Sequence, residues 1–152
     1  MFRYRTLFSC EKWSTISKDE QDIRHPLTDK IDLLYLTGLL NSKVLDWFLK
    51  RVTTDFRGGY FAANKQFLSQ LPIRTIDFDD TADVAQHERM VALVERMLDL
   101  HRRQSAAATP QERSVVQRQI AATDVEIDAL VYALYGLTEA EIAIVEGRGS
   151  SA

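Results

Sequence analysis

The sequence has few of the residues from which redox, nucleophilic and metal sites are built. Cys10 is the one cysteine among 152 residues, so neither an internal disulfide nor a zinc site of several cysteines can form within the chain. His25, His87 and His101 are spaced too widely for a metal-ligand motif such as HExxH. A single thiol that cannot form an internal disulfide fits a reducing compartment, so we expect a cytoplasmic protein. Because no histidine or aspartate pattern accompanies Cys10, we do not expect it to act as a nucleophile.

Phosphate-binding loops and long apolar runs are missing as well. None of the 6 glycines belongs to a GxxxxGK or GxGxxG motif. No apolar run approaches the roughly 18 residues that a membrane-spanning helix requires, so we expect no membrane association. The acidic stretch DFDDTAD, residues 77–83, lacks the glycine and terminal glutamate of an EF-hand loop and is predicted to be a solvated linker. We therefore expect no catalytic residue and no metal site.

The first half of the chain predicts a mixture of short elements. Residues 1–30 favour a strand followed by a charged loop. Residues 31–52 place apolar side chains at helical spacing, and Asn41-Ser42 predicts either a kink there or two helices in tandem. Residues 53–63 favour strand, interrupted by a turn at Gly58-Gly59. A short helix, KQFLSQL, and a short strand, IRTIDF, are predicted to follow.

The second half predicts two long helices. Residues 86–104 and 110–134 repeat apolar side chains in steps of three and four, which is typical of a packed seam. Thr109 and Glu112 form a capping box around Pro110, so we expect the second helix to start there and the two to form an antiparallel hairpin. Gly136 is predicted to end the second long helix. A second capping box, Thr138 with Glu141, is predicted to open a short terminal helix.

These elements predict an α+β fold. Residues 1–80 are expected to form a small, irregular, β-rich recognition part with a buried helix, and residues 81–152 a helical hairpin and spacer with a short terminal helix.

Charge is distributed unevenly along the chain, although the formal net charge is only -3. Between residues 43 and 74 six cations and two acids give a local charge of +4, with aromatic residues interleaved. Between residues 77 and 99 two cations and seven acids give −5. A basic segment rich in aromatics suits a surface that faces phosphate, while a solvated face is the simpler alternative.

Three motifs, taken in order, resemble a known family. They are GLLNSK within LYLTGLLNSKVLDWFLKRV, then FRGGYFAANKQFLSQLPI, then EIDALVYALYGLT. Together they are similar to the TaqI-like C-terminal specificity domain of type IIG restriction-modification enzymes and adenine-N6 DNA methyltransferases. The likeness covers roughly residues 31–146 and leaves the first thirty residues unassigned.

The resemblance implies sequence-specific recognition of double-stranded DNA within a restriction-modification system. It also implies that chemistry belongs elsewhere, because neither Asn41 nor Asn64 is followed by the proline of an NPPY methylation motif. S-adenosylmethionine and magnesium are expected only in a partner or a separate catalytic domain, a methyltransferase or endonuclease. The chain is then expected to be a C-terminal piece, a truncated reading frame or a separate specificity subunit.

Candidate DNA-binding residues are polar side chains in or near the FRGGYFAANKQFLSQLP segment. Arginine and lysine can contact phosphate, arginine can read guanine, and carboxamides can bond to adenine edges. Gly58 and Gly59 are expected to shape the turn. The candidates are Arg57, Tyr60, Asn64, Lys65, Gln66 and Lys43. Asn64 is equally well placed to cap the following helix.

A second interpretation assigns the chain to a different class of protein. The helical hairpin would serve as a protein-interaction module, which forms a homodimer through its seam or docks on a methyltransferase subunit.

Overall fold

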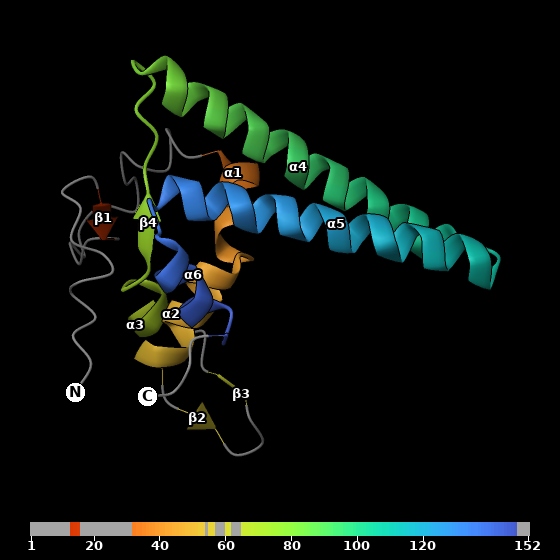
Figure 1. Ribbon diagram of the computed structural model, residues 1–152, viewed down its shortest axis with the longest axis horizontal. Helices are drawn as coiled ribbons and strands as arrows, with labels where there is room; N and C mark the ends of the chain where they lie inside the picture. The colour runs from red at the N-terminus through yellow and green to blue at the C-terminus, as the bar shows by residue number, and fades with distance from the viewer. Residues whose placement is uncertain (1–12, 16–31, 54, 57–59, 62–64, 149–152) are drawn as a thin grey trace. The chain divides into compact units, whose positions relative to one another are not determined.

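The computed structural model describes residues 13–15, 32–53, 55–56, 60–61 and 65–148 (Figure 1). Its helices are α1 (Leu33–Leu40), α2 (Lys43–Val52), α3 (Lys65–Leu68), α4 (Thr81–Ala106), α5 (Pro110–Leu134) and α6 (Glu139–Val145). Its strands are β1 (Trp13–Thr15), β2 (Asp55–Phe56), β3 (Tyr60–Phe61) and β4 (Pro72–Arg74). The strand expected at the start of residues 1–30, from the alternation of Phe2, Tyr4, Thr6 and Phe8, lies outside the described part of the chain.

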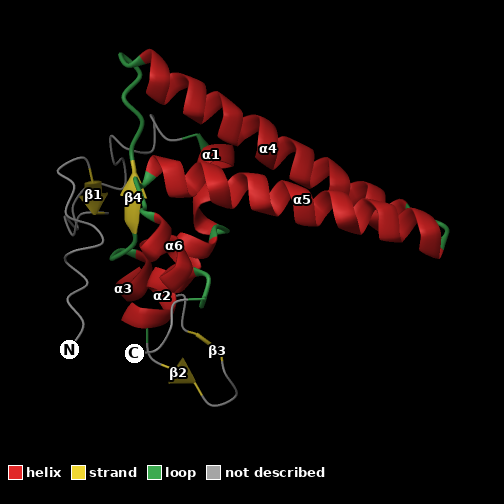
Figure 2. Cartoon of the chain, in the orientation of Figure 1, coloured by secondary structure: helices red, strands yellow, loops and turns green. Residues whose placement is uncertain are grey.

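The prediction of an α+β fold with a β-rich recognition part is wrong. In the described residues each strand has only two or three residues, whereas α4 and α5 have 26 and 25 (Figure 2). IRTIDF was expected to be a strand, but pairing stops at Arg74 and the following residues lead into α4. Short alternating runs are weak signals of strand, because pairing depends on partners far away in the sequence.

The chain divides into two compact units whose segments are interleaved in sequence. Unit 1 comprises Met1–Ile31, Lys43–Thr75 and Tyr132–Ala152, and unit 2 comprises Asp32–Ser42 and Ile76–Val131. The functional division at residue 80 stays a prediction.

Unit 2 is built on α1, α4 and most of α5. Helix α1 lies against α4, and Gly38 makes their close approach feasible. A Cβ atom at residue 38 would meet Met90 Sδ at 2.3 Å and Val94 Cγ2 at 3.1 Å. Both of those side chains are buried. Asp32 caps α1 by accepting a hydrogen bond of 2.7 Å from the Leu34 N–H.

Helices α4 and α5 occupy the two segments with seam spacing, and α4 begins five residues earlier than expected. The cause lies in the acidic stretch predicted to be a linker. Asp80 caps α4 by accepting from Ala82 N at 2.9 Å, and buried Asp83 accepts from Asp77 N at 3.0 Å. Acidic residues at the start of a helix stabilise it, because they accept hydrogen bonds from the free N–H groups of the first turn and their negative charge interacts favourably with the positive end of the helix dipole.

The two long helices run antiparallel, as their cross-helix contacts show. Arg96 pairs with Glu126 at 3.3 Å, and Gln104 bonds to Gln117 nearer the connecting loop. Beside those contacts Leu100, Val116 and Ile120 form a buried cluster with Met97 packed against it. Thr123 is fully buried in the same seam, where its hydroxyl donates to Gln119 O at 2.9 Å.

The predicted signals for helix ends are confirmed. Glu112 N donates to Thr109 Oγ1 while Glu112 Oε2 accepts from Thr109 N, both at 3.2 Å. Gly136 follows α5 with φ +61°, and Leu137 N closes the end by donating to Tyr132 O at 3.0 Å. The Thr138 and Glu141 capping box opens α6.

Unit 1 holds the short strands with α2, α3 and α6. Strand β1 pairs antiparallel with β4, with Trp13 opposite Arg74, and β2 pairs antiparallel with β3. Helix α2 contacts both α3 and α6. Tyr135 reaches β4 from the end of α5, because its buried hydroxyl donates to the Pro72 carbonyl at 2.8 Å.

Candidate nucleic-acid interface

Helix α2 carries one predicted DNA-binding residue, Lys43, at its first position. Asn41 and Ser42 connect α1 to α2, so the prediction of two helices in tandem is confirmed. Ser42 Oγ stabilises this connection by donating to Leu39 O at 2.6 Å. Val44, Leu45 and Trp47 are buried. The opposite face therefore points outward and carries Lys43, Asp46 and Lys50.

Helix α3 carries the next two candidates, Lys65 and Gln66, and both side chains are exposed. The Gln66 carbonyl accepts from Ser69 Oγ at 3.1 Å and from Gln70 Nε2 at 2.9 Å, which closes this four-residue helix. Since α3 contacts α2, Lys43, Lys65 and Gln66 come from neighbouring elements of unit 1.

The other candidates belong to the part of the chain whose side chains are not described. Arg57, Gly58, Gly59 and Asn64 lie outside the described residues. Tyr60 belongs to β3, for which only the backbone is described. Their assignment to DNA binding or to the turn stays a prediction.

The basic segment presents less free charge than its sequence count suggests. Arg74 is only 9% exposed, although it was counted with the basic segment. Lys50 pairs with Asp46 at 2.5 Å. The Arg51 guanidinium carbon lies 3.6 Å from the Trp47 ring centroid, and Nη1 donates to Trp47 O at 3.1 Å. These three cations are engaged within unit 1, and Lys43, which lies 3.7 Å from Glu146, is a fourth among the segment's six.

Sequence reasoning missed Glu146, which lies close to Lys43. Lys43 Nζ lies 3.7 Å from Glu146 Oε1, and Tyr132 OH donates to the same oxygen at 3.2 Å. Arg148 Nε donates to Glu146 Oε2 at 2.7 Å. The hydrogen bond from Arg148, followed by weaker contributions from Tyr132 and Lys43, lowers the pKa of the Glu146 carboxyl, although desolvation opposes the shift.

The lowered pKa of Glu146 fixes the sign of its pH dependence. The contribution of the Glu146 carboxylate to the stability of the folded state is complete above the ordinary pKa of a glutamate, and it is lost as the pH falls through the lowered pKa. At neutral pH the carboxylate is charged and lies beside Lys43. No local signal could reveal this contact, because 103 positions separate the two residues. The Trp47 and Arg51 stack, by contrast, follows from their spacing of four on a helix.

Replacing Glu146 with glutamine is expected to strengthen duplex binding modestly, by about threefold or less at low salt. The substitution removes a carboxylate beside Lys43, and the effect stays small because solvent screens an exposed ion pair of this kind. Fluorescence anisotropy with a labelled duplex measures the effect. Glu139→Gln at the start of α6 is the matched control, because it changes the net charge equally. Equal gains from both variants would argue against a role of Lys43 at the interface.

The described residues show neither a metal-binding cluster nor a membrane-spanning helix. Within them no group of three or more histidine, cysteine, aspartate or glutamate side chains is placed to hold a metal ion. None of the described helices is both long and apolar enough to cross a membrane.

Comparison with known proteins relates residues in this interface to DNA-modifying enzymes. The family model of the TaqI-like C-terminal specificity domain matches residues 5–73. The type II restriction enzyme and methyltransferase RM.Eco57I of Escherichia coli is 27% identical over 126 residues. That alignment covers 82% of this chain and 12% of the enzyme, so the chain spans only a small part of its relative. No solved structure matches.

The family match corrects the extent of the predicted resemblance. It includes most of the first thirty residues, which the motifs left unassigned, and it ends within β4. All six candidate DNA-binding residues lie inside it. The predicted resemblance to the TaqI-like C-terminal specificity domain is thereby confirmed, and the match extends over residues 5–73.

Proposed function

We propose that this chain recognises the DNA target sequence of a restriction-modification enzyme. The observation that carries the proposal is the match of residues 5–73 to a specificity domain, because this range contains every candidate DNA-binding residue. The similarity to a combined restriction enzyme and methyltransferase supports the same role. The exposed side chains of Lys43, Lys65 and Gln66 are chemically suited to phosphate and base contacts.

Catalysis is assigned to another part of the system. The partner we propose is a methyltransferase and endonuclease domain or subunit that binds S-adenosylmethionine and magnesium. The chain's share of its relative, 12%, is consistent with a specificity part joined to a much larger catalytic one. Incubation of the pure chain with DNA, magnesium and S-adenosylmethionine tests this division, and any cleavage or methyl transfer would contradict it.

Duplex binding as a function of salt is the experiment that tests recognition. The chain is mixed with a library of random-sequence duplexes at low salt, bound molecules are sequenced, and the enriched duplex is titrated. A specific binder enriches a defined site, and its affinity falls steeply as salt rises. Absence of duplex binding at low salt together with a stable homodimer would favour the protein-interaction alternative.

Arg57→Ala is expected to weaken binding to the enriched duplex by about tenfold or more while the chain stays folded. A bidentate arginine contact to guanine contributes about 1–3 kcal/mol, and a phosphate contact contributes less but steepens the salt dependence. Relaxed preference at one base pair would identify base reading. Unchanged affinity, or loss of the circular dichroism signal, would refute the assignment of Arg57 to the interface.

A further inference from the structure

The connected end of the α4–α5 pair carries a concentration of positive charge. Residues 100–122 contain four arginines and a single acid, Glu112, and thus a net charge of +3. All four arginine side chains are exposed. We call this set the arginine cluster: Arg102, Arg103, Arg113 and Arg118.

The same two helices are acidic away from this end. Residues 81–99 of α4 carry −2, three further aspartates lie directly before the helix at residues 77–80, and residues 123–131 of α5 carry −3 through Asp124, Glu126 and Asp128. The pair is therefore electrically polarised along its length, whereas a merely solvated helical face usually mixes both signs. Separation of charge on this scale produces a local field that attracts anions to one end.

The arginine cluster is largely uncompensated by acids. Glu112 is occupied at the start of α5, where its Oε2 accepts from Ala108 N and Thr109 N. Arg102 is 4.0 Å from Asp99, and its side chain is still 77% exposed. Among the described residues no carboxylate lies within ion-pair distance of Arg103, Arg113 or Arg118.

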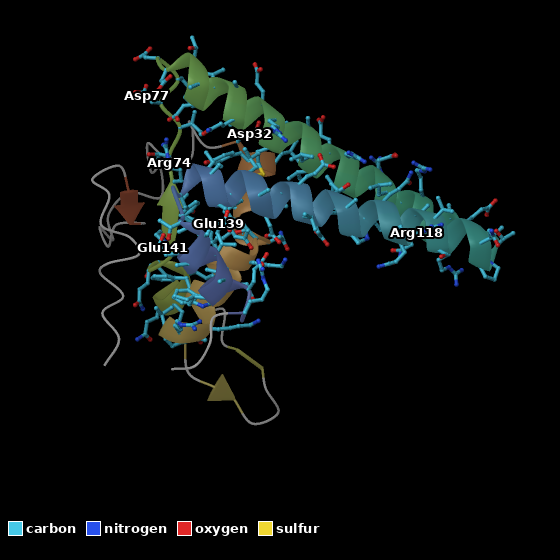
Figure 3. The ribbon with its side chains drawn as sticks, viewed as in Figure 1. Asp32, Arg74, Asp77, Arg118, Glu139 and Glu141 are labelled. Carbon is cyan, nitrogen blue, oxygen red and sulfur yellow. The ribbon has the colours of Figure 1, made fainter. Side chains whose placement is uncertain are left out.

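Helical spacing distributes the arginine cluster around the end of the pair. Arg102 and Arg118 follow the buried residues Leu100 and Val116 by two positions each, about 200° around the helix, so each points away from the other helix. Arg103 and Arg113 are three positions from the same buried residues and flank the seam. Figure 3 shows Arg118 on the part of α5 nearer the connecting loop.

We propose that the arginine cluster binds the sugar-phosphate backbone of duplex DNA without regard to sequence. It lies outside residues 5–73 and would add a second contact to the one made by the specificity domain. Guanidinium groups bind phosphate oxygens through charge-assisted, often bidentate hydrogen bonds. Because the arginines surround the end, a duplex meets two or more of them, but not all four at once.

This inference rests on the proposed function, which brings DNA to the chain. The competing partner for the arginine cluster is a second copy of this chain, whose acidic segments carry the complementary charge. Duplex DNA is favoured because its charge density, about one negative charge per 1.7 Å of axis, far exceeds that of a helix face.

The test compares the salt dependence of duplex binding between the unmodified chain and two variants, each of which carries four substitutions. One variant replaces the arginine cluster with glutamine (R102Q/R103Q/R113Q/R118Q) and the other with lysine. The probe is a labelled mixed-sequence duplex of about 30 base pairs, titrated between about 50 and 200 mM salt. Arg89→Gln is the control, since Arg89 is exposed on α4 within the acidic stretch.

The glutamine variant is expected to reduce the slope of log affinity against log salt by about 2 to 3, since each lost phosphate contact removes about 0.9 and a duplex meets two or three of the arginines. Its affinity at low salt falls tenfold or more, while the lysine variant keeps most of the slope and Arg89→Gln leaves it unchanged. Sequence preference in the random library is unaffected, because phosphate contacts carry no base information.

The outcomes separate this inference from the proposed function. If the unmodified chain binds a defined site and the glutamine variant keeps its slope, the arginine cluster does not contact DNA and the proposed function stands. If the glutamine variant only alters self-association on a sizing column, the occupant is a second copy and the inference is overturned. If the unmodified chain binds no duplex at low salt, both fail.

Discussion

Tyr135→Ala is expected to destabilise unit 1 by about 4 kcal/mol, the largest effect of any substitution considered for this protein. The side chain is 6% exposed, and its hydroxyl donates to the Pro72 carbonyl at 2.8 Å. Truncation removes a buried aromatic ring and also leaves a buried carbonyl without its partner. Urea unfolding followed by tryptophan fluorescence measures the loss, because both tryptophans, Trp13 and Trp47, belong to unit 1.

Tyr135→Phe is the matched control for the hydrogen bond. It keeps the ring and removes only the donor, so we expect a loss of about 1–2 kcal/mol. If Tyr135→Phe is as damaging as alanine, the hydrogen bond rather than the ring dominates. If neither variant changes the tryptophan transition, Tyr135 does not hold β4 in place.

Gly38→Leu is expected to destabilise unit 2 by about 3 kcal/mol through overpacking. A Cβ at this position would lie 2.3 Å from Met90 Sδ, and the buried Met90 and Val94 side chains leave a larger group no room. The helices α1 and α4 must then separate. Far-UV circular dichroism in urea is the measurement, since α4 and α5 contribute most of the helical signal.

Thr37→Leu is the control for Gly38→Leu, because Thr37 is the exposed neighbour on the same helix. It is expected to change stability by no more than about 0.5 kcal/mol. In the background of Met90→Ala, which removes the obstructing sulfur, Gly38→Leu should be much less harmful, and the double-mutant cycle gives the coupling. Equal losses in both backgrounds would show that Gly38 and Met90 do not meet.

The Tyr135 contact joins residues inside the family match to residues far beyond it. The family match ends at residue 73, yet Lys43–Thr75 and Tyr132–Ala152 belong to the same compact unit. Helix α2 contacts α6, and Glu146 lies beside Lys43. The candidate interface is therefore supported by residues at the other end of the chain, even though the motifs that suggested DNA binding are local.

Local sequence signals were sufficient for the existence of both long helices and for the ends of α5. Steps of three and four identified α4 and α5, the Thr109 and Gly136 signals located the two ends of α5, and the Thr138 signal located the start of α6. These features depend on residues within a few positions of one another, so a single sequence contains all of the information. The prediction that residues 77–83 form a linker was wrong, because an aspartate that caps a helix cannot be told by residue type from an aspartate in a linker.

Strand content and the state of the basic segment were not readable in this way. Pairing of β1 with β4 joins residues about sixty positions apart, and no local pattern shows that it stops after three residues. Likewise, Arg74 contributes a positive charge in the sequence but lies buried in β4. A count of charges cannot distinguish a cation that faces solvent from one that is buried or paired.

For this protein, the sequence by itself determined the family resemblance, the candidate DNA-binding residues and the positions of the long helices. Only the tertiary structure showed that Glu146 lies beside Lys43, that the Tyr135 hydroxyl donates a hydrogen bond to the Pro72 carbonyl, and that Met90 packs closely against Gly38. The physical reason is the range of the interactions. Helical periodicity and capping act over a few residues, whereas burial and ion pairing depend on contacts between distant segments, which exist only once the chain has folded.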